Sequence, residues 1–92
     1  MSDKSQPADT TGGVEAVERA LRVLDVFVPG DTGLSLKQVS DRSGVNKATI
    51  LRLCVSLEKF GHVTRDADGL FHLGPSLWRL GSVFRQNLRM GP

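Results

Sequence analysis

The sequence predicts a small, mainly α-helical domain that carries one β-hairpin. Apolar residues recur at helical spacing in four segments, and a glycine ends the second and the third of these segments. After the third segment, two short segments flank a turn that contains glycine, which is typical of a hairpin. The 92 residues are enough for one such domain and too few for two ordinary ones.

Residues 1–13 are predicted to form a disordered tail, because they are polar and have almost no apolar content. The segment from Val14 to Val28 is predicted to be a helix. Its helical spacing predicts one buried face, which consists of Val17, Ala20, Leu21, Leu24 and Val28. Apolar residues also lie on other sides of this helix, at Val14, Ala16, Val23 and Val26. They indicate either contact with a partner subunit or a deep position in a small core.

A loop over residues 29–33 separates this helix from a second one, predicted from Leu36 to Ser43. The hydroxyl of Ser35 can cap free backbone N–H groups, and Gln38 three residues later completes a capping box. Gly44 can adopt the left-handed backbone conformation that ends a helix, because it has no Cβ. The residues of this part that are predicted to face the core are Leu36, Val39 and Val45.

A third helix is predicted from about Asn46 to Phe60, and Gly61 ends it. Its predicted core residues are Ile50, Leu53, Cys54 and Leu57, with Phe60 as an extension. The hairpin that follows consists of residues 62–65, the turn 66–69 and residues 70–73, with Val63 and Phe71 directed inward. Pro75 then opens a fourth helix. Its predicted apolar stripe is Leu77, Leu80, Phe84 and Leu88.

A helix, a glycine-containing turn and a second helix form the helix-turn-helix pattern, and the hairpin extends it to a winged helix-turn-helix. The second helix of such a pair can enter the major groove of DNA. The charge distribution agrees with this ligand, since residues 34–65 carry a net charge of +4 and residues 1–33 carry −3. A basic segment attracts phosphate, but it can equally be an ordinary solvated face.

The face of the third helix opposite its core residues is the predicted base-reading surface. Arg52 can donate two hydrogen bonds to a guanine edge, and Thr49 can bind a base or a phosphate. Lys47 is predicted to contact phosphate, whereas Asn46 is either a DNA contact or only a helix cap. Lys59 is either a DNA contact or a solvated cation near the C-terminal end of the helix.

Apolar and flanking positions complete the predicted interface. Leu51 and Val55 lie on the outer face, where they either touch thymine methyl groups or are simply tolerated. Ser35 is first a cap, and the helix that it starts can direct backbone N–H groups at a phosphate. Arg65 is the candidate phosphate contact of the hairpin. Asp66 and Asp68 at its tip argue against a wing that grips DNA and favour a wing that mainly covers the core.

Other classes of function find little support in the sequence. No apolar run approaches the ~20 residues of a membrane span, and the N-terminus lacks the apolar core of a signal peptide. The single Cys54 cannot form an internal disulfide, which is typical of a reducing cytosol. His62 and His72 lack a further ligand set at metal spacing, so we expect no metal, no cofactor and no enzyme activity.

Two stretches of the chain together resemble a known family. VERALRVLDVF and LSLKQVSDRSGVNKATILRLCVSLEKFGHVTRDADGLFHLGPSLWRLG are similar to the N-terminal domain of the IclR family of bacterial transcriptional regulators, over about Val14 to Leu88. The resemblance implies a cytoplasmic protein that binds palindromic operators as a dimer or tetramer, with the first helix pairing the DNA-binding domains. It implies DNA contacts at Lys47, Thr49 and Arg52, supported by Ser35 and by Arg19.

The resemblance also implies a domain organisation. Residues 14–74 are expected to be the DNA-binding domain and residues 75–92 a linker helix toward a C-terminal effector domain, which this chain lacks and which would bind a small molecule. The chain departs from the family at Asn46, where proline is frequent, and at Leu51 and Leu70, which are often polar or basic. A second hypothesis is a winged-helix module that binds protein through the apolar outer surfaces of the first and fourth helices.

Overall fold

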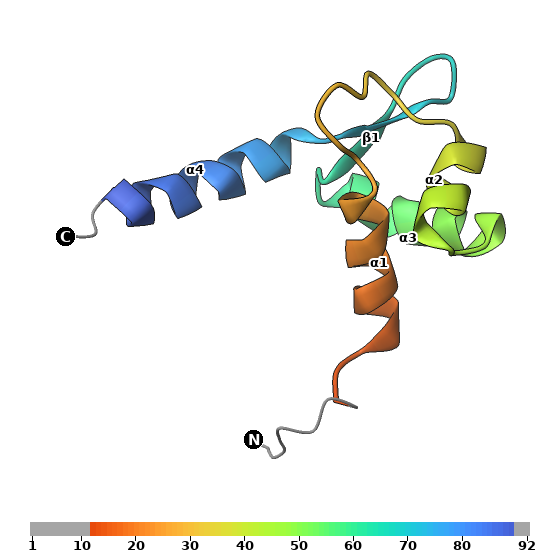
Figure 1. Ribbon diagram of the computed structural model, residues 1–92, viewed down its shortest axis with the longest axis horizontal. Helices are drawn as coiled ribbons and strands as arrows, with labels where there is room; N and C mark the ends of the chain where they lie inside the picture. The colour runs from red at the N-terminus through yellow and green to blue at the C-terminus, as the bar shows by residue number, and fades with distance from the viewer. Residues whose placement is uncertain (1–11, 90–92) are drawn as a thin grey trace.

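The computed structural model describes residues 12–89, which form a three-helix body, a hairpin and a projecting helix (Figure 1). The predicted tail falls mostly outside these described residues. The body consists of α1 (Glu15–Asp25), α2 (Leu36–Ser43) and α3 (Lys47–Lys59), and both α1 and α2 pack on α3. The hairpin strands β1 (Val63–Arg65) and β2 (Phe71–Leu73) follow, and α4 (Pro75–Arg89) ends the described chain.

Local signals in the sequence determine α2 and its end as predicted. The Ser35 hydroxyl accepts a hydrogen bond from the backbone N–H of Gln38 at 3.1 Å, and the Gln38 side chain accepts one from the Ser35 backbone at 2.8 Å. Gly44 has φ 74°, in the left-handed region that favours glycine. The predicted capping box and the predicted glycine stop are therefore both confirmed, and they set the tight turn between α2 and α3.

The buried face of α1 differs from the predicted one. Val23 and Val26 enter the core, whereas Val17, Leu21 and Val28 are more than half exposed. Of the predicted face, only Ala20 and Leu24 are partly buried, and Leu24 packs against the core. The physical reason is that this helix is apolar on several sides, so periodicity alone could not select the side that meets α2 and α3. The helix also ends at Asp25, three residues before the predicted boundary.

The core stripe of α3 is largely the predicted one. Ile50 and Cys54 are buried, and Leu53 and Leu57 pack partly against the core. Phe60 was predicted to extend this stripe, but its side chain is 71% exposed. The helix ends at Lys59, so Phe60 is the C-cap residue and its side chain leaves the core face.

The hairpin is antiparallel, with Val63 opposite Leu73 and Arg65 opposite Phe71. Val63 and Phe71 are buried as predicted, each with 1% of its surface exposed. A further pairing was not predicted: Leu34, just before α2, exchanges two backbone hydrogen bonds with Phe71, at 2.9 and 2.7 Å. This bridge holds the hairpin against the start of the helix-turn-helix.

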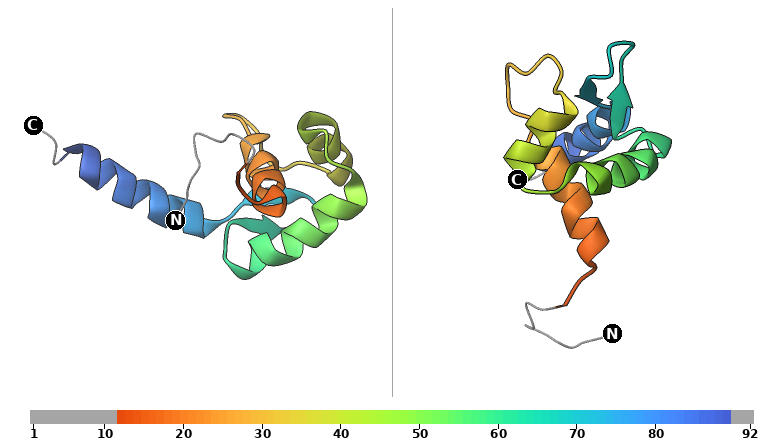
Figure 2. Two further views of the ribbon diagram at one scale, coloured as in Figure 1. Left: turned by 90° about the horizontal axis from the view of Figure 1, so that it is seen from below. Right: turned by 90° about the vertical axis from the view of Figure 1, so that its right-hand side faces the viewer.

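The fourth helix projects away from α2, as Figure 1 and the left view of Figure 2 show. Its first turn is fixed to the end of α3, because Ser76 donates a backbone hydrogen bond to Gly61 at 2.9 Å and a hydroxyl hydrogen bond to Phe60 at 2.6 Å. The predicted stripe is not a core stripe within this chain, since Leu80, Phe84 and Leu88 are all exposed. No other described element lies along the helix to cover them.

Within residues 12–89, no helix has the length and apolar character needed to cross a membrane. The same described part of the chain contains no group of three or more histidine, cysteine or acidic side chains that could hold a metal ion.

Candidate nucleic-acid interface

The outer surface of α3 is exposed along its whole length. Of the residues predicted for this surface, Leu51, Arg52, Val55 and Lys59 are solvent-accessible in the structure, and so are Ala48 and Ser56. Ile50 and Cys54 anchor the opposite side of the helix in the core, with 0% and 2% of their surfaces exposed. Burial raises the pKa of the Cys54 thiol to about 11, so this cysteine behaves as a small apolar residue. The core therefore fixes one side of α3, and the opposite side is open to solvent.

The N-terminal end of α3 is organised by Asn46. The side-chain Oδ1 of Asn46 accepts a hydrogen bond from the backbone N–H of Thr49 at 2.9 Å, so Asn46 is the helix cap. Thr49 itself is half-buried, and Lys47 is exposed. Lys47 lies close enough to Asp41 of α2 to contribute to lowering the pKa of that carboxyl, although the hydrogen bond from Lys37 is the main cause.

The basic middle third of the chain does not present all of its charge. Lys37 pairs with Asp41 at 2.8 Å on α2. Arg42 pairs with Asp31 at 2.9 Å and donates a second hydrogen bond to the carbonyl of Val26 at 3.0 Å. Hydrogen bonds from the Val28 backbone and from Arg42 hold the pKa of Asp31 below its usual value, so this carboxylate remains a counter-charge.

Four cations of that segment are left without an ion-pair partner among the described residues: Lys47, Arg52, Lys59 and Arg65. Three of them belong to α3. The structure therefore places on one helix three of the four cations of this segment that form no ion pair with a described residue, which the net charge alone could not show.

Ser35 and Arg19, the two candidate DNA contacts that flank α3, each have an identified partner. Ser35 uses its oxygen as an acceptor in the capping box, so its hydroxyl proton remains free to be donated. Arg19, on α1, forms an ion pair with Glu15 at 2.8 Å. Arg19 also lines a recess at the N-terminal end of α3, together with Arg22, which sequence reasoning missed. The spacing of three residues between these arginines was a sign that they share one side of α1.

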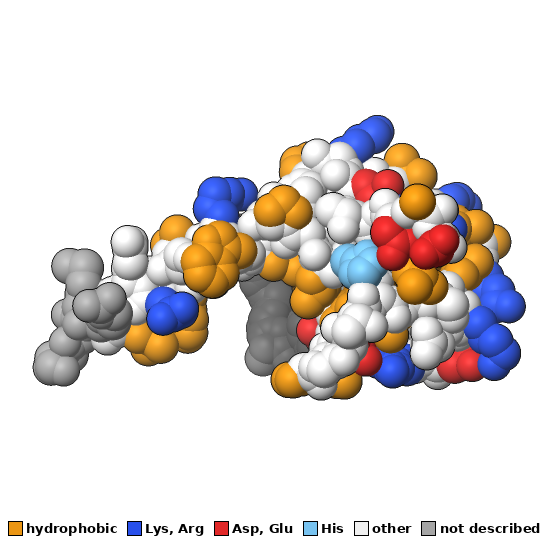
Figure 3. All heavy atoms as spheres, turned by 90° about the horizontal axis from the view of Figure 1, so that it is seen from above, with side chains coloured by type: hydrophobic (Ala, Val, Ile, Leu, Met, Phe, Trp, Pro, Cys, Tyr) orange, Lys and Arg blue, Asp and Glu red, His pale blue; other side chains and the backbone are white. Residues whose placement is uncertain are grey.

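Arg65, the candidate of the wing, is directed back onto the hairpin. Its guanidinium carbon lies 4.5 Å from the centre of the Phe71 ring, and its Nε lies 3.4 Å from the carbonyl oxygen of Gly69. In the turn, Asp66 accepts backbone hydrogen bonds from Asp68 and Leu70 and contacts the His72 ring at 2.7 Å. Figure 3 shows this face, with acidic side chains beside a histidine. The wing is thus acidic at its tip, as the sequence indicated.

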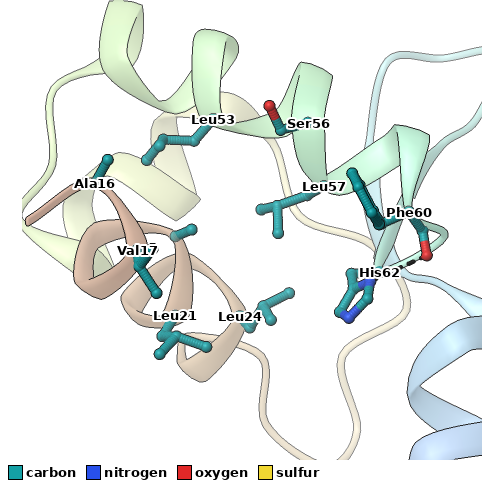
Figure 4. A pocket seen from close by; sticks show the side chains of 10 residues that line it. Ala16, Val17, Leu21, Leu24, Leu53, Ser56, Leu57, Phe60 and His62 are labelled. Atoms are coloured by element: carbon teal, nitrogen blue, oxygen red, sulfur yellow. Dashed lines mark hydrogen bonds between the residues drawn. The ribbon is translucent and has the colours of Figure 1, made fainter. Parts of the chain in front are cut away.

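An apolar groove lies between α1 and α3, on a different side of α1 from the two arginines. Its volume is about 550 Å³, and Val17 and Leu21 of α1 face Leu57 of α3 and the C-cap residue Phe60 across it (Figure 4). At its end, the Nδ1 atom of His62 lies 3.1 Å from the Phe60 carbonyl oxygen. The groove brings together the exposed apolar residues of α1 that the core leaves uncovered.

The order of elements, the left-handed glycine between α2 and α3, and the hairpin packed behind α3 define a winged helix-turn-helix domain. The chain matches the IclR helix-turn-helix domain over residues 16–67, and it belongs to this family. Relatives matched over most of this chain are HTH-type transcriptional regulators.

Individual relatives agree with this assignment. The chain is 33% identical over 78 residues to the HTH-type transcriptional regulator BhcR of Paracoccus denitrificans. The matched region covers 84% of this chain and 28% of BhcR. It is 32% identical over 69 residues to the HTH-type transcriptional regulator XynR of Escherichia coli, covering 74% of this chain and 27% of XynR. The chain therefore spans less than a third of the length of these relatives.

Solved structures show the same fold. An IclR family transcriptional regulator from Brucella abortus matches with a TM-score of 0.72 and 30% sequence identity, over 82% of this chain and 29% of that one. An IclR homologue from Microbacterium in complex with 4-hydroxybenzoate matches with a TM-score of 0.65 and 28% identity, over 71% of this chain and 27% of that one. In each case the matched region is again less than a third of the solved chain.

Proposed function

We propose that this chain binds double-stranded DNA in a sequence-specific manner and serves as the operator-reading part of a bacterial transcriptional regulator. The observation that carries the proposal is the surface of α3, which is open to solvent and holds Lys47, Arg52 and Lys59 without an ion-pair partner among the described residues. A helix held in this way can enter the major groove, and uncompensated cations on it attract the phosphate backbone.

Within this interface, Arg52 and Thr49 are the proposed base contacts, because a guanidinium and a hydroxyl can read base edges. Lys47, with its exposed ammonium at the start of α3, is a proposed backbone contact. Ser35 joins it through its free hydroxyl proton and through the N-terminal end of α2. Asn46 acts as the cap, and its amide N–H₂ group remains available to donate to DNA.

Arg65 and Arg19 are weaker candidates for contacts to DNA. The packing of Arg65 over Phe71 limits its reach, so it contributes a backbone contact only where DNA passes the hairpin. The Glu15 carboxylate neutralises part of the charge of Arg19. Both arginines therefore supply long-range attraction to phosphate more than base readout.

The experiment that tests this function is selection of duplexes from a random DNA pool, followed by binding to the selected sequence at several salt concentrations. Specific binding predicts an enriched motif and a steep decrease of affinity with salt. Recovery of no motif, together with a flat salt response, would reject DNA binding. The spacing of half-sites in the motif also tests whether the operator is palindromic.

We further propose that two copies associate through α1. Val17 and Leu21 of α1, and Val14 at its N-cap, are each more than half exposed, and an apolar surface of this kind favours contact with another chain. In sedimentation experiments, Leu21→Glu should weaken self-association, whereas Val55→Glu on the DNA-facing side of α3 should not. Val55 is a matched control, because its exposure of 56% is close to the 53% of Leu21. A wild-type chain that stays monomeric at high concentration would reject this proposal.

The proposal for α4 follows from its position. It leaves the body with its apolar residues uncovered, so we assign it the role of a linker helix toward the region that the longer relatives possess beyond the match. A small-molecule effector would then bind in that region and not in this chain. Titration of this chain with 4-hydroxybenzoate, the compound in the Microbacterium complex, should give no binding signal.

A module that binds protein without reading DNA is the second candidate, and the exposed Trp78 and Phe84 of α4 favour it. The two candidates differ in which substitutions matter. Loss of partner binding on Phe84→Ala with unchanged behaviour of Arg52→Ala supports the protein-binding module, and the reverse pattern supports DNA readout.

A further inference from the structure

A polar recess opens between the side of α1 and the N-terminal end of α3. Its volume is about 170 Å³, and it is lined by Arg19, Arg22, Gly44, Val45, Asn46 and Thr49. A water molecule in the liquid occupies about 30 Å³, so the recess has room for a group of a few heavy atoms. It lies beside Thr49, one of the two proposed base contacts.

The two arginines of the recess differ in how their charge is compensated. The Nη2 atom of Arg19 is 2.8 Å from the Glu15 carboxylate. Arg22 forms no ion pair and no side-chain hydrogen bond with any residue in the described part of the chain. Glu18 and Asp25 stand four residues before and three residues after Arg22, at helical pairing distance in sequence, yet neither carboxylate pairs with it. Among the described residues, none therefore occupies the five N–H donors of Arg22.

The remainder of the lining also favours an anion. No acidic side chain lines the recess. The N-terminal end of α3 carries the partial positive charge of the helix, and Asn46 presents its amide donors because its oxygen already accepts from Thr49. Two arginines, Asn46 and the N-terminal end of a helix thus line one small polar space.

We propose that this recess seats a phosphate of the DNA backbone and that Arg22 is a contact to that phosphate. The inference rests on the proposed DNA binding and extends it to a residue of α1. A guanidinium can hold two phosphate oxygens at once, which fixes the position of α1 on the duplex without reading a base. The phosphate next to Thr49 would in this way set the register in which α3 meets the base edges.

The test compares salt-dependent binding of four full-length chains to one short mixed-sequence duplex. The chains are the wild type, Arg22→Gln, Arg22→Lys and Arg85→Gln. Arg85→Gln is the matched control, since it removes the same charge from an exposed site on α4, which projects away from the recess. Circular dichroism and thermal unfolding of each chain show that it is folded.

Loss of one phosphate contact predicts that Arg22→Gln lowers the slope of log affinity against log salt by about 1 and weakens binding by about tenfold at low salt. The loss should be the same on every DNA sequence, because a phosphate carries no base identity. Arg22→Lys keeps the charge, so it should keep the slope and lose part of the affinity. Arg85→Gln should behave as the wild type.

Equal behaviour of Arg22→Gln and Arg85→Gln, in a wild type that binds DNA, overturns the role of Arg22 and leaves the proposed function intact. A wild-type chain that does not bind the duplex at all overturns both. If Arg22→Gln unfolds, Arg22→Lys decides the question, because a purely structural arginine gives a folded Lys variant with unchanged affinity.

Discussion

The side-chain oxygen of Asn46 lies 2.9 Å from the backbone nitrogen of Thr49 and accepts its hydrogen bond. One residue thus caps the proposed DNA-reading helix and positions the residue that we assign to base contact. This relationship separates two roles that the sequence left open for Asn46, because a cap stabilises the fold and a base contact changes specificity.

Asn46→Ala is therefore expected to destabilise the fold by about 1 kcal/mol, the typical cost of a lost N-cap. Asn46→Ser keeps a capping oxygen and should restore most of the free energy of unfolding. Chemical denaturation of the three chains gives the comparison. A large change in the selected DNA motif with Asn46→Ser, at unchanged stability, would show that Asn46 reads a base and is not mainly a cap.

Arg52→Ala is expected to weaken binding to the selected operator by about 1–3 kcal/mol, as for a lost bidentate contact to guanine. Its binding to unrelated DNA should decrease much less. Lys47→Ala is the matched comparison on the same exposed surface, and it should weaken binding to both kinds of DNA alike. Quantitative binding to the operator and to a scrambled duplex separates these outcomes. Equal losses for Arg52→Ala on both duplexes would assign Arg52 to the backbone.

The parts of the fold that the sequence predicts well are determined by neighbouring residues. Ser35 with Gln38 forms the capping box, and Gly44 adopts the left-handed conformation, because these features depend on residues within a few positions. The core side of α3 also follows from its own pattern, since Ile50, Leu53, Cys54 and Leu57 recur at helical spacing.

The parts of the fold that differ from the prediction depend on contacts between segments that are distant in the sequence. α1 buries Val23 and exposes Leu21, and its packing against α2 and α3 decides this. The bridge from Leu34 to Phe71 joins residues 37 positions apart, which no local pattern reveals. The candidate site also has one part set by local sequence and one part set by contacts between distant segments. The exposed side of α3 was predictable, whereas the recess that contains Arg22 exists only once α1 lies against α3.

Gly44→Ala tests the turn of the helix-turn-helix. A Cβ at Gly44 would meet no atom within 4 Å, so the substitution changes only the backbone energy at φ 74°. We expect a loss of about 1–2 kcal/mol in the free energy of unfolding, the cost of a left-handed conformation for a residue with a Cβ.

The same substitution at Gly81 is the control. Gly81 lies inside α4, and a Cβ there also meets no atom within 4 Å. Because alanine favours a helix by about 1 kcal/mol over glycine, Gly81→Ala should increase the helix content measured by circular dichroism. A Gly44→Ala chain as stable as the wild type would contradict the role of the turn.

Asp66 provides the expected pH dependence of the wing. Hydrogen bonds from His72 and from the backbone of Leu70 and Asp68 hold the pKa of the Asp66 carboxyl below its usual value of 3.8. A lowered pKa in the folded state means that the charged carboxylate stabilises the fold above pH 3.8, and that this contribution is lost as the pH falls through the folded-state pKa.

Asp66→Asn should therefore reduce stability at neutral pH and make stability less dependent on pH at the acid end, as followed by thermal unfolding from neutral to strongly acidic solution. Asp68→Asn is the matched control, because it removes the same charge from the same turn and the Asp68 side chain makes no hydrogen bond with another described residue. The difference between the two variants should be present at neutral pH and disappear once Asp66 is protonated in the wild type. If the two variants have the same stability at neutral pH, the contacts of Asp66 with His72 and the turn contribute nothing to the stability of the wing.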